Sequence, residues 1–107
     1  MNEVTNDSIK CSIALSDLYN VYDPEIGLNV VDLGLIYQIM FYDEDKRLDC
    51  EMTLTTQFCP MGESITNNVI QSLTKSFPEW EINVNLTFEP AWDYTRISPE
   101  GQEFLGH

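Results

Sequence analysis

The stretch IYQIMFYDEDKRLDCEMTL, residues 36–54, decides the fold class. On both sides of the charged run 43–47, apolar and polar residues alternate, as they do in strands that bury one face. Branched and aromatic residues extend the first run back to Val30. The pattern predicts a strand over 30–42, a turn over 43–47 and a second strand over 48–54, paired as a hairpin.

Helical patterns flank this hairpin. The first predicted helix carries apolar residues three and four positions apart, namely Ile9, Ile13, Ala14, Leu18 and Val21. Asn6 or Asp7 would cap it, and it should end by Tyr22 or Asp23 because Pro24 disfavours helix at the preceding residue. The second predicted helix starts at Pro60, which suits a first helical position, and ends at Pro78. Its apolar residues recur every four positions: Ile65, Val69, Leu73 and Phe77.

A third strand is predicted between the second helix and Pro90. Its apolar residues alternate with polar ones: Ile82, Val84, Leu86 and Phe88. We therefore expect one α+β domain over 1–107, a small two-layer α/β sandwich with helices on one face of a mixed sheet. The order is helix, hairpin, helix and strand. Residues 1–6 are expected to be flexible, and the C-terminal tail 91–107 to dock on the domain.

Composition and charge exclude several classes of protein. The 107 residues include 18 acidic and 5 basic side chains, a net charge of −13, which would repel a nucleic-acid duplex or an anionic membrane. The first twenty residues lack a basic n-region and an apolar h-region, so we expect no signal peptide, and no apolar run approaches the ~20 residues of a membrane span. Three irregularly spaced cysteines are typical of reduced thiols, so we expect a cytoplasmic protein. His107 is the single histidine, which excludes an internal Ser-His or Cys-His pair and argues against a conventional zinc site.

Cys59 is the first candidate for chemistry. It precedes Pro60 and would therefore cap the second helix, where free N–H groups and the helix dipole favour an anion. A thiol at that position becomes a better nucleophile and metal ligand, although a cysteine can also serve there as a small polar cap. Cys50 follows the alternation of the hairpin and should lie in the core. Cys11 lies off the apolar stripe of the first helix, so we interpret it as an incidental thiol.

Polar residues near turns form the second candidate group. Asp23 and Glu25 flank Pro24 and could act as general acid and base, bind a hard cation, or shape a turn. Hydroxyl groups stand just before Cys59 and could line the same pocket or simply face solvent; they belong to Thr53, Thr55 and Thr56. Gly34, which follows Asp32 and precedes a predicted strand, suggests a bulge or a close backbone approach.

Five segments, in this order, resemble the SufT-like iron-sulfur maturation family. They are DPEIG at 23–27, NVVDLGLIY at 29–37, MTLT at 52–55 with CP at 59–60, FEPAW at 88–92, and a tail from ISPEG at 97–101 to LG at 105–106. The family includes SufT, the phenylacetate-pathway protein PaaD and a eukaryotic component of the cytosolic iron-sulfur targeting complex.

The resemblance implies a fold similar to the C-terminal domain of NifU scaffolds and a role in maturing or delivering iron-sulfur clusters. The family's reactive cysteine corresponds to Cys59, its acidic pair to Asp23 and Glu25, and its hydroxyl-bearing strand end to Thr53 and Thr55. Gln57-Phe58 departs from the proline or small residue that many members carry before the cysteine. The C-x-x-C pair of NifU-type scaffolds is absent, so the scaffold function is not implied.

The leading hypothesis is an accessory factor, not an enzyme, that contacts an iron-sulfur scaffold, carrier or client protein. One thiolate per chain cannot supply the four ligands that a cluster usually needs. A transient cluster or iron ion on Cys59 would need further ligands from a second copy in a homodimer, from a partner or from a small thiol. Three alternatives stay open: a PaaD-like subunit that serves one oxygenase, an enzyme with Cys59 as nucleophile, and an acidic module that docks a basic partner.

Overall fold

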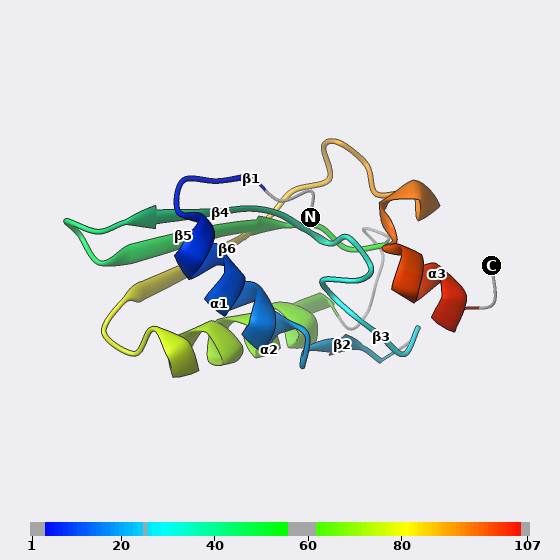
Figure 1. The fold of residues 1–107 in the computed structure, drawn as a ribbon, viewed down its shortest axis with the longest axis horizontal. Helices are drawn as coiled ribbons and strands as arrows, with labels where there is room; N and C mark the ends of the chain where they lie inside the picture. The colour runs from blue at the N-terminus through cyan, green and yellow to red at the C-terminus, as the bar shows by residue number, and fades with distance from the viewer. Residues whose placement is uncertain (1–3, 25, 56–61, 106–107) are drawn as a thin grey trace.

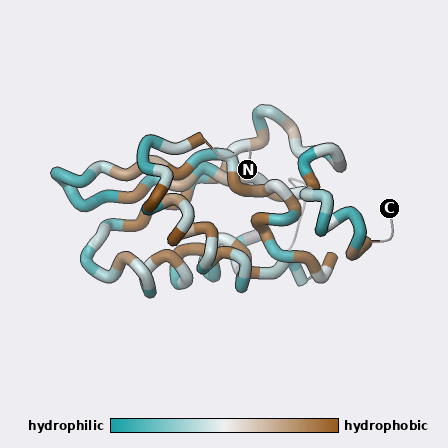
Figure 2. The backbone as a smooth tube through the Cα atoms, in the orientation of Figure 1, coloured by the Kyte–Doolittle hydropathy of each residue, from teal (hydrophilic) through white to brown (hydrophobic). Residues whose placement is uncertain are grey.

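A four-stranded mixed sheet forms the centre of the fold in the computed structural model, which describes residues 4–24, 26–55 and 62–105 (Figure 1). The strands are β1 (Val4–Thr5), β4 (Ile36–Tyr42), β5 (Arg47–Met52) and β6 (Glu81–Leu86), in the spatial order β1-β4-β5-β6. β4 and β5 pair antiparallel, which confirms the predicted hairpin, and both outer pairs are parallel. The hairpin's turn is hydrophilic, in keeping with its place at one tip of the molecule (Figure 2).

Two helices, α1 (Ser8–Leu18) and α2 (Gly62–Ser76), pack against each other and against one face of this sheet. The predicted stripe of the second helix is confirmed, because Ile65, Val69 and Leu73 are completely buried. The strand residues that face the helices, Leu48 and Cys50 among them, are equally buried. This arrangement confirms an α+β fold. Among the described residues, no helix has both the length and the hydropathy needed to cross a bilayer.

The predicted apolar stripe of the first helix is wrong in its orientation. Ile9 is 75% exposed and Ile13 46% exposed, whereas the helix buries Cys11, Ala14, Leu15 and Leu18. These four residues also follow helical spacing, so the sequence allowed either face. In the observed orientation, Lys10 bonds to Asp7 at 3.1 Å and to Asp43 of the hairpin turn at 2.7 Å. The helix ends at Leu18, earlier than predicted.

The start of α1 is fixed by its predicted cap. The side chain of Asp7 accepts a hydrogen bond from the Lys10 N–H at 3.0 Å. This backbone bond, with the side-chain bond from Lys10, lowers the pKa of Asp7. The bonds that Lys10 makes to Asp43 and Asp7 raise its own pKa. The cap is therefore strongest when Asp7 is ionised.

Three short strands were not predicted. β1 pairs with β4, and the side-chain amide of Asn6 bonds to both the C=O and the N–H of Phe41, at 2.8 and 2.9 Å. Residues 4–6 thus lie against β4, and their expected flexibility stays a prediction. β2 (Tyr22–Asp23) and β3 (Leu28–Asn29) form a separate antiparallel pair. Strands of two residues are too short for their periodicity to be detected in a sequence.

The segment 30–35 is not a strand, contrary to the prediction. Its N–H groups turn back locally, from Leu33 to the C=O of Asn29 and from Leu35 to the C=O of Val30, both at 3.0 Å. Its apolar side chains are nevertheless buried, which explains why the segment has the composition of a strand. The third predicted strand is confirmed as β6, although it ends at Leu86 rather than near Phe88.

The C-terminal tail docks on the domain, as expected, at the end of the molecule opposite the hairpin turn (Figure 1). It contains η1 (Tyr94–Arg96) and α3 (Pro99–Phe104). Ile97 is buried, and the indole N–H of Trp92 donates to the C=O of Leu33 at 2.6 Å. Phe104, in α3, is 65% exposed.

Candidate functional site

Asp23 lies in a tight turn between β2 and β3. Its C=O accepts hydrogen bonds from the N–H groups of Gly27, at 2.7 Å, and Ile26, at 3.3 Å. Gly27 has a φ of +82°, a conformation that glycine adopts without strain. The predicted turn is therefore confirmed. Asp23 is also only 1% exposed, so its carboxylate belongs to the interior of this end of the molecule.

Backbone hydrogen bonds connect this turn to the end of β5. The N–H of Val30 donates to the C=O of Val21 at 2.9 Å, and the N–H of Leu35 donates to Val30 at 3.0 Å. The N–H of Thr53 then donates to the C=O of Leu35 at 2.8 Å. These hydrogen bonds link the strand pair that holds Asp23 to the residue Thr53 that follows β5, although thirty positions separate the two in sequence.

The two described threonines of the candidate group differ in exposure. Thr53 is completely buried, and its hydroxyl donates a long bond to the C=O of Leu54 at 3.4 Å. Thr55 is half-buried. Thr53 is therefore not a solvent-facing strand residue, which was the alternative left open by the sequence.

Three predicted site residues, Glu25, Thr56 and Cys59, lie outside the described residues. The segment that carries Cys59 is bounded by two described residues, Thr55 after β5 and Gly62 at the start of α2. Its predicted role as a helix cap stays a prediction. The structure describes the residues that precede this segment. β5 ends at Met52, and Thr53 follows it, bonded to the turn 30–35.

The two described cysteines belong to the core. Cys50 is completely buried and Cys11 is 3% exposed. Burial, with smaller contributions from Cys11 and Glu51, raises the pKa of the Cys50 thiol to about 12. The predicted core position of Cys50 is confirmed. The predicted position of Cys11 off the buried face of its helix is wrong, because α1 turns that side inward. A thiol this far from ionisation is a poor nucleophile and metal ligand at neutral pH.

Asp32 holds the C-terminal tail against the turn 30–35. Its carboxylate accepts bonds from the side-chain amide of Asn29 at 2.7 Å and from the hydroxyl of Ser98 at 2.8 Å. Its C=O accepts a third bond, from the N–H of Ser98, at 2.7 Å. Ser98 in turn caps α3 by accepting from the N–H of Gly101 at 3.0 Å. Asp32 therefore has a structural role in this end of the molecule.

Gly34 allows the tail to approach closely, as the sequence predicted. Its φ is +75°, and a Cβ atom at this position would lie 2.3 Å from the backbone oxygen of Arg96. No side chain fits that gap. The guanidinium of Arg96 then stacks on the ring of Tyr37, with its central carbon 4.4 Å from the ring centroid.

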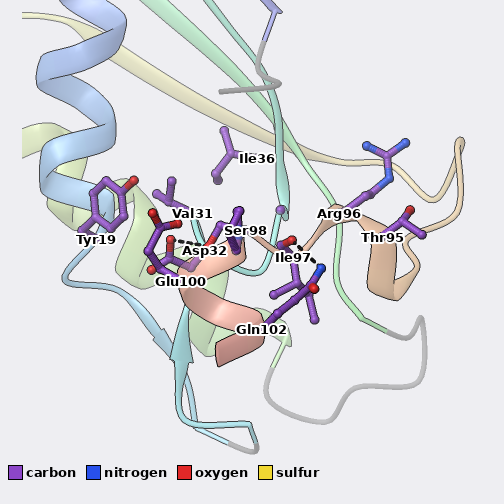
Figure 3. A pocket seen from close by; sticks show the side chains of 12 residues that line it. Tyr19, Val31, Asp32, Ile36, Thr95, Arg96, Ile97, Ser98, Glu100 and Gln102 are labelled. Atoms are coloured by element: carbon purple, nitrogen blue, oxygen red, sulfur yellow. Dashed lines mark hydrogen bonds between the residues drawn. The ribbon is translucent and has the colours of Figure 1, made fainter. Parts of the chain in front are cut away.

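A cavity of about 580 Å³ lies between the tail and the turn 30–35. Tyr19, Asp32 and Glu100 group on one side of it, and Arg96 points away from them at the other (Figure 3). None of the twelve described residues that line it carries a thiol or an imidazole. The cavity can therefore bind a polar group by hydrogen bonds, but its lining offers no nucleophile of that kind.

Sequence reasoning missed the tail residues of this cavity. Ser98 followed by Pro99 is a helix start, with a capping hydroxyl and a proline at the first helical position, and could have predicted α3. No comparable signal exists for Tyr19, Arg96 or Gln102, which the fold brings together. Within residues 4–24, 26–55 and 62–105, no three His, Cys, Asp or Glu side chains group closely enough to hold a metal ion.

The fold and this end of the molecule define a small α+β protein that gathers carboxylate and hydroxyl groups beside a cysteine-bearing segment and buries its two other thiols. The family described as iron-sulfur cluster assembly protein matches residues 14–86. The chain belongs to this family, which confirms the resemblance seen in the five sequence segments.

Individual relatives agree with this assignment. The chain is 38% identical to the Fe-S protein maturation auxiliary factor of Porphyromonas gingivalis over 89 residues, which cover 83% of this chain and 84% of the relative. It is 36% identical to the Fe-S protein maturation auxiliary factor SufT of Staphylococcus aureus over 87 residues, 80% of this chain and 97% of the relative.

A solved structure agrees as well. The crystal structure of the DUF59 domain of unknown function from Bacillus anthracis superimposes with a TM-score of 0.83 at 34% identity, covering 89% of this chain and 90% of that one. The shared mixed sheet and two helices confirm the α+β class. The expected similarity to the C-terminal domain of NifU scaffolds stays a prediction.

Proposed function

We propose that this chain, an auxiliary factor in iron-sulfur protein maturation, acts through Cys59 at the end of the molecule that also holds Asp23 and Thr53. One observation carries the proposal: Cys11 and Cys50 are buried in the core, and burial raises the pKa of Cys50 to about 12. Cys59 is therefore the thiol left for binding iron or an iron-sulfur cluster. The similarity to Fe-S protein maturation auxiliary factors supports iron-sulfur chemistry. The hydrogen-bonded turns next to the end of β5 support this end of the molecule as its location.

Iron or a cluster is cargo in this proposal, and the chain supplies only part of its ligands. A cluster usually takes four cysteine ligands, and Cys59 is one. The remaining ligands would come from a partner, a second copy or a small thiol. Asp23 and Glu25 would either hold iron through carboxylate oxygens, which suit hard cations, or orient the partner. Thr53, Thr55 and Thr56 would line the same pocket.

The partners in this proposal are the scaffold or carrier that supplies the cargo and the client apoprotein that receives it. The net charge of −13 favours partners with basic docking surfaces and disfavours nucleic acid and anionic membranes. No turnover of a substrate is required, so the chain acts as an accessory protein rather than an enzyme. A cytoplasmic location fits this role.

Anaerobic titration tests the proposal. The protein is titrated with ferrous iron and sulfide, or with a cluster-loaded donor, beside a Cys59→Ser variant. Cys50→Ala serves as the matched control, because it removes a thiol from the core and leaves Cys59 in place. Absorbance reports cluster formation, and native mass reports how many chains share the cargo.

We expect uptake in the wild-type protein and in the Cys50→Ala variant, and its loss in the Cys59→Ser variant. Loss in Cys50→Ala alone, with uptake retained in Cys59→Ser, would assign the cargo to the core thiol and refute the proposal. Absence of uptake in all three proteins would also refute cargo binding by this chain.

A further inference from the structure

β6 is an edge strand with a free side. Its N–H groups at Glu81 and Thr87 donate toward β5, to the C=O of Lys46 at 2.7 Å and of Met52 at 2.9 Å. Because the N–H and C=O of successive strand residues point to opposite sides, those of Ile82, Val84 and Leu86 point to the outer edge. Within the described chain, no residue hydrogen-bonds to these outward groups.

The apolar side chains of the same three residues are incompletely covered. Ile82 and Val84 are only partly buried, and Leu86 is 45% exposed. Phe88, just beyond the strand, is 36% exposed. The paired residues on the neighbouring strand β5, Leu48, Cys50 and Met52, are completely buried. The core is therefore closed at β5 and open along β6, where one more strand would cover it.

The opposite edge of the sheet is different. β1 has two residues, and the side-chain amide of Asn6 occupies both backbone groups of Phe41 where a longer strand would continue. Short edge strands and local side-chain bonds are ways in which proteins prevent further pairing. Of the two described edges, only β6 presents outward-facing backbone groups on three alternate residues, Ile82, Val84 and Leu86.

Charge decides which strand fits. Exposed Glu81 is the first residue of β6, and the whole chain carries a net charge of −13. A second copy on this edge would bring together two chains of that charge. A segment flanked by basic residues would be attracted instead.

We propose that the outer edge of β6 binds an extended segment of a partner protein, with alternating apolar residues flanked by lysine or arginine. The segment adds a fifth strand, as in β-strand addition to an exposed sheet edge. Its backbone bonds to Ile82, Val84 and Leu86, and its apolar side chains cover Leu86 and Phe88. The inference rests on the proposed function only in that an auxiliary factor must dock on other proteins; it does not involve Cys59.

Amide hydrogen exchange tests this surface directly. The probe is a synthetic peptide, acetyl-Lys-Lys-Thr-Val-Thr-Val-Thr-Val-Thr-Lys-Lys-amide, added to the full chain. In the free protein, the amides of Ile82, Val84 and Leu86 should exchange much faster than those of Asn83 and Asn85, which face β5. Saturating peptide should slow the three outward amides by about tenfold or more.

Three matched controls separate backbone pairing from charge. The same peptide with N-methylated valines cannot donate to the edge and should give no slowing. Val84→Pro removes an outward N–H and leaves the bonds to β5 intact, so it should abolish binding of the unmodified peptide. The surface variant Glu81→Lys should weaken binding by about threefold, and added salt should reduce that difference.

Each other outcome overturns the inference. If the amides stay fast at saturating peptide, or if protection appears on other strands, β6 is not the docking edge. If the outward amides become protected with protein concentration alone and the native mass doubles, the occupant is a second copy. The Cys59→Ser variant should bind the peptide normally, so a failure here is distinguishable from a failure of iron or cluster uptake.

Discussion

The two ends of the molecule are built by different physical means. At the hairpin end, three aromatic rings pack together, with the ring of Phe41 5.6 Å from that of Phe77 and 5.9 Å from that of Trp80. Lys10 lies over Trp80. At the tail end, short turns and hydrogen bonds of Asp32 replace regular packing, and buried polar residues gather there: Asp23, Asn29 and Thr53.

This contrast separates a stabilising region from a positioning region. A substitution in an apolar cluster has a graded effect on stability, because a smaller side chain still fills part of the same space. Hydrogen-bonded turns and left-handed residues are specific, because each depends on one atom in one place. The turn that holds Asp23 and the strand end at Thr53 belong to the second kind, because backbone hydrogen bonds set their positions.

The largest effect is expected for Gly34→Ala. A Cβ atom would lie 2.3 Å from the backbone oxygen of Arg96, and the residue would keep a positive φ. We expect a loss of about 4 kcal/mol in unfolding free energy, measured by urea denaturation. The control is Gly27→Ala, which has φ +82° but no atom within 4 Å and should cost about 1 kcal/mol. Equal costs at the two positions would contradict the close approach of the tail.

A smaller, local effect is expected for Asp32→Ala. It removes the acceptor of the bonds from Asn29 and Ser98, which we expect to cost about 2–3 kcal/mol and to release the tail. Limited proteolysis should then cut within 97–105. The control Asp49→Ala removes a carboxylate that contacts Arg47 on the sheet surface and should cost less than about 1 kcal/mol. A tail that resists protease in Asp32→Ala would show that Asp32 does not hold it.

Phe77→Leu tests the aromatic cluster at the hairpin end of the molecule. Its ring packs on Phe41 and Trp80, and leucine fills part of the same volume, so we expect a loss of about 1–2 kcal/mol. Protease resistance of the tail should not change. If this substitution releases the tail as Asp32→Ala does, the two ends are not separable as we describe them.

The smallest effect concerns the cap of α1. Because the folded-state pKa of Asp7 is lowered from its ordinary value of 3.8, its charge stabilises the protein above that pH. That contribution is lost as pH falls through the lowered folded-state pKa. Asp7→Asn keeps a capping oxygen without the charge, so we expect the variant to be slightly less stable at pH 7 and equal to wild type in strong acid. A constant difference across pH would contradict the role of the charge.

The regular elements near the hairpin could be predicted from the sequence. The alternation around 43–47 gave β4 and β5 correctly, and the four-residue repeat gave the buried face of α2. For α1, Ile9 and Ile13 competed with Cys11 and Leu15 at equally helical spacing. The choice depended on how α1 packs against α2 and the rest of the core, contacts between distant segments.

The tail end could be predicted only in part. The turn at Asp23 and the close approach at Gly34 follow from local chemistry, because proline and glycine restrict or extend the backbone in known ways. The hydrogen bond from the Ser98 hydroxyl to the Asp32 carboxylate could not be predicted, because it joins residues 66 positions apart. The turns of the apolar segment 30–35 could not be predicted either, because they depend on what packs around the segment rather than on its composition.

The central claim is that maturation depends on Cys59 and not on the core thiols. The most direct measurement is the activity of an iron-sulfur dehydratase in cells that lack the native chain and express wild-type, Cys59→Ser, Cys50→Ala or Cys11→Ala protein at equal levels. We predict that Cys59→Ser gives the activity of the empty control, whereas the two core variants restore wild-type activity. Full restoration by Cys59→Ser would contradict the account.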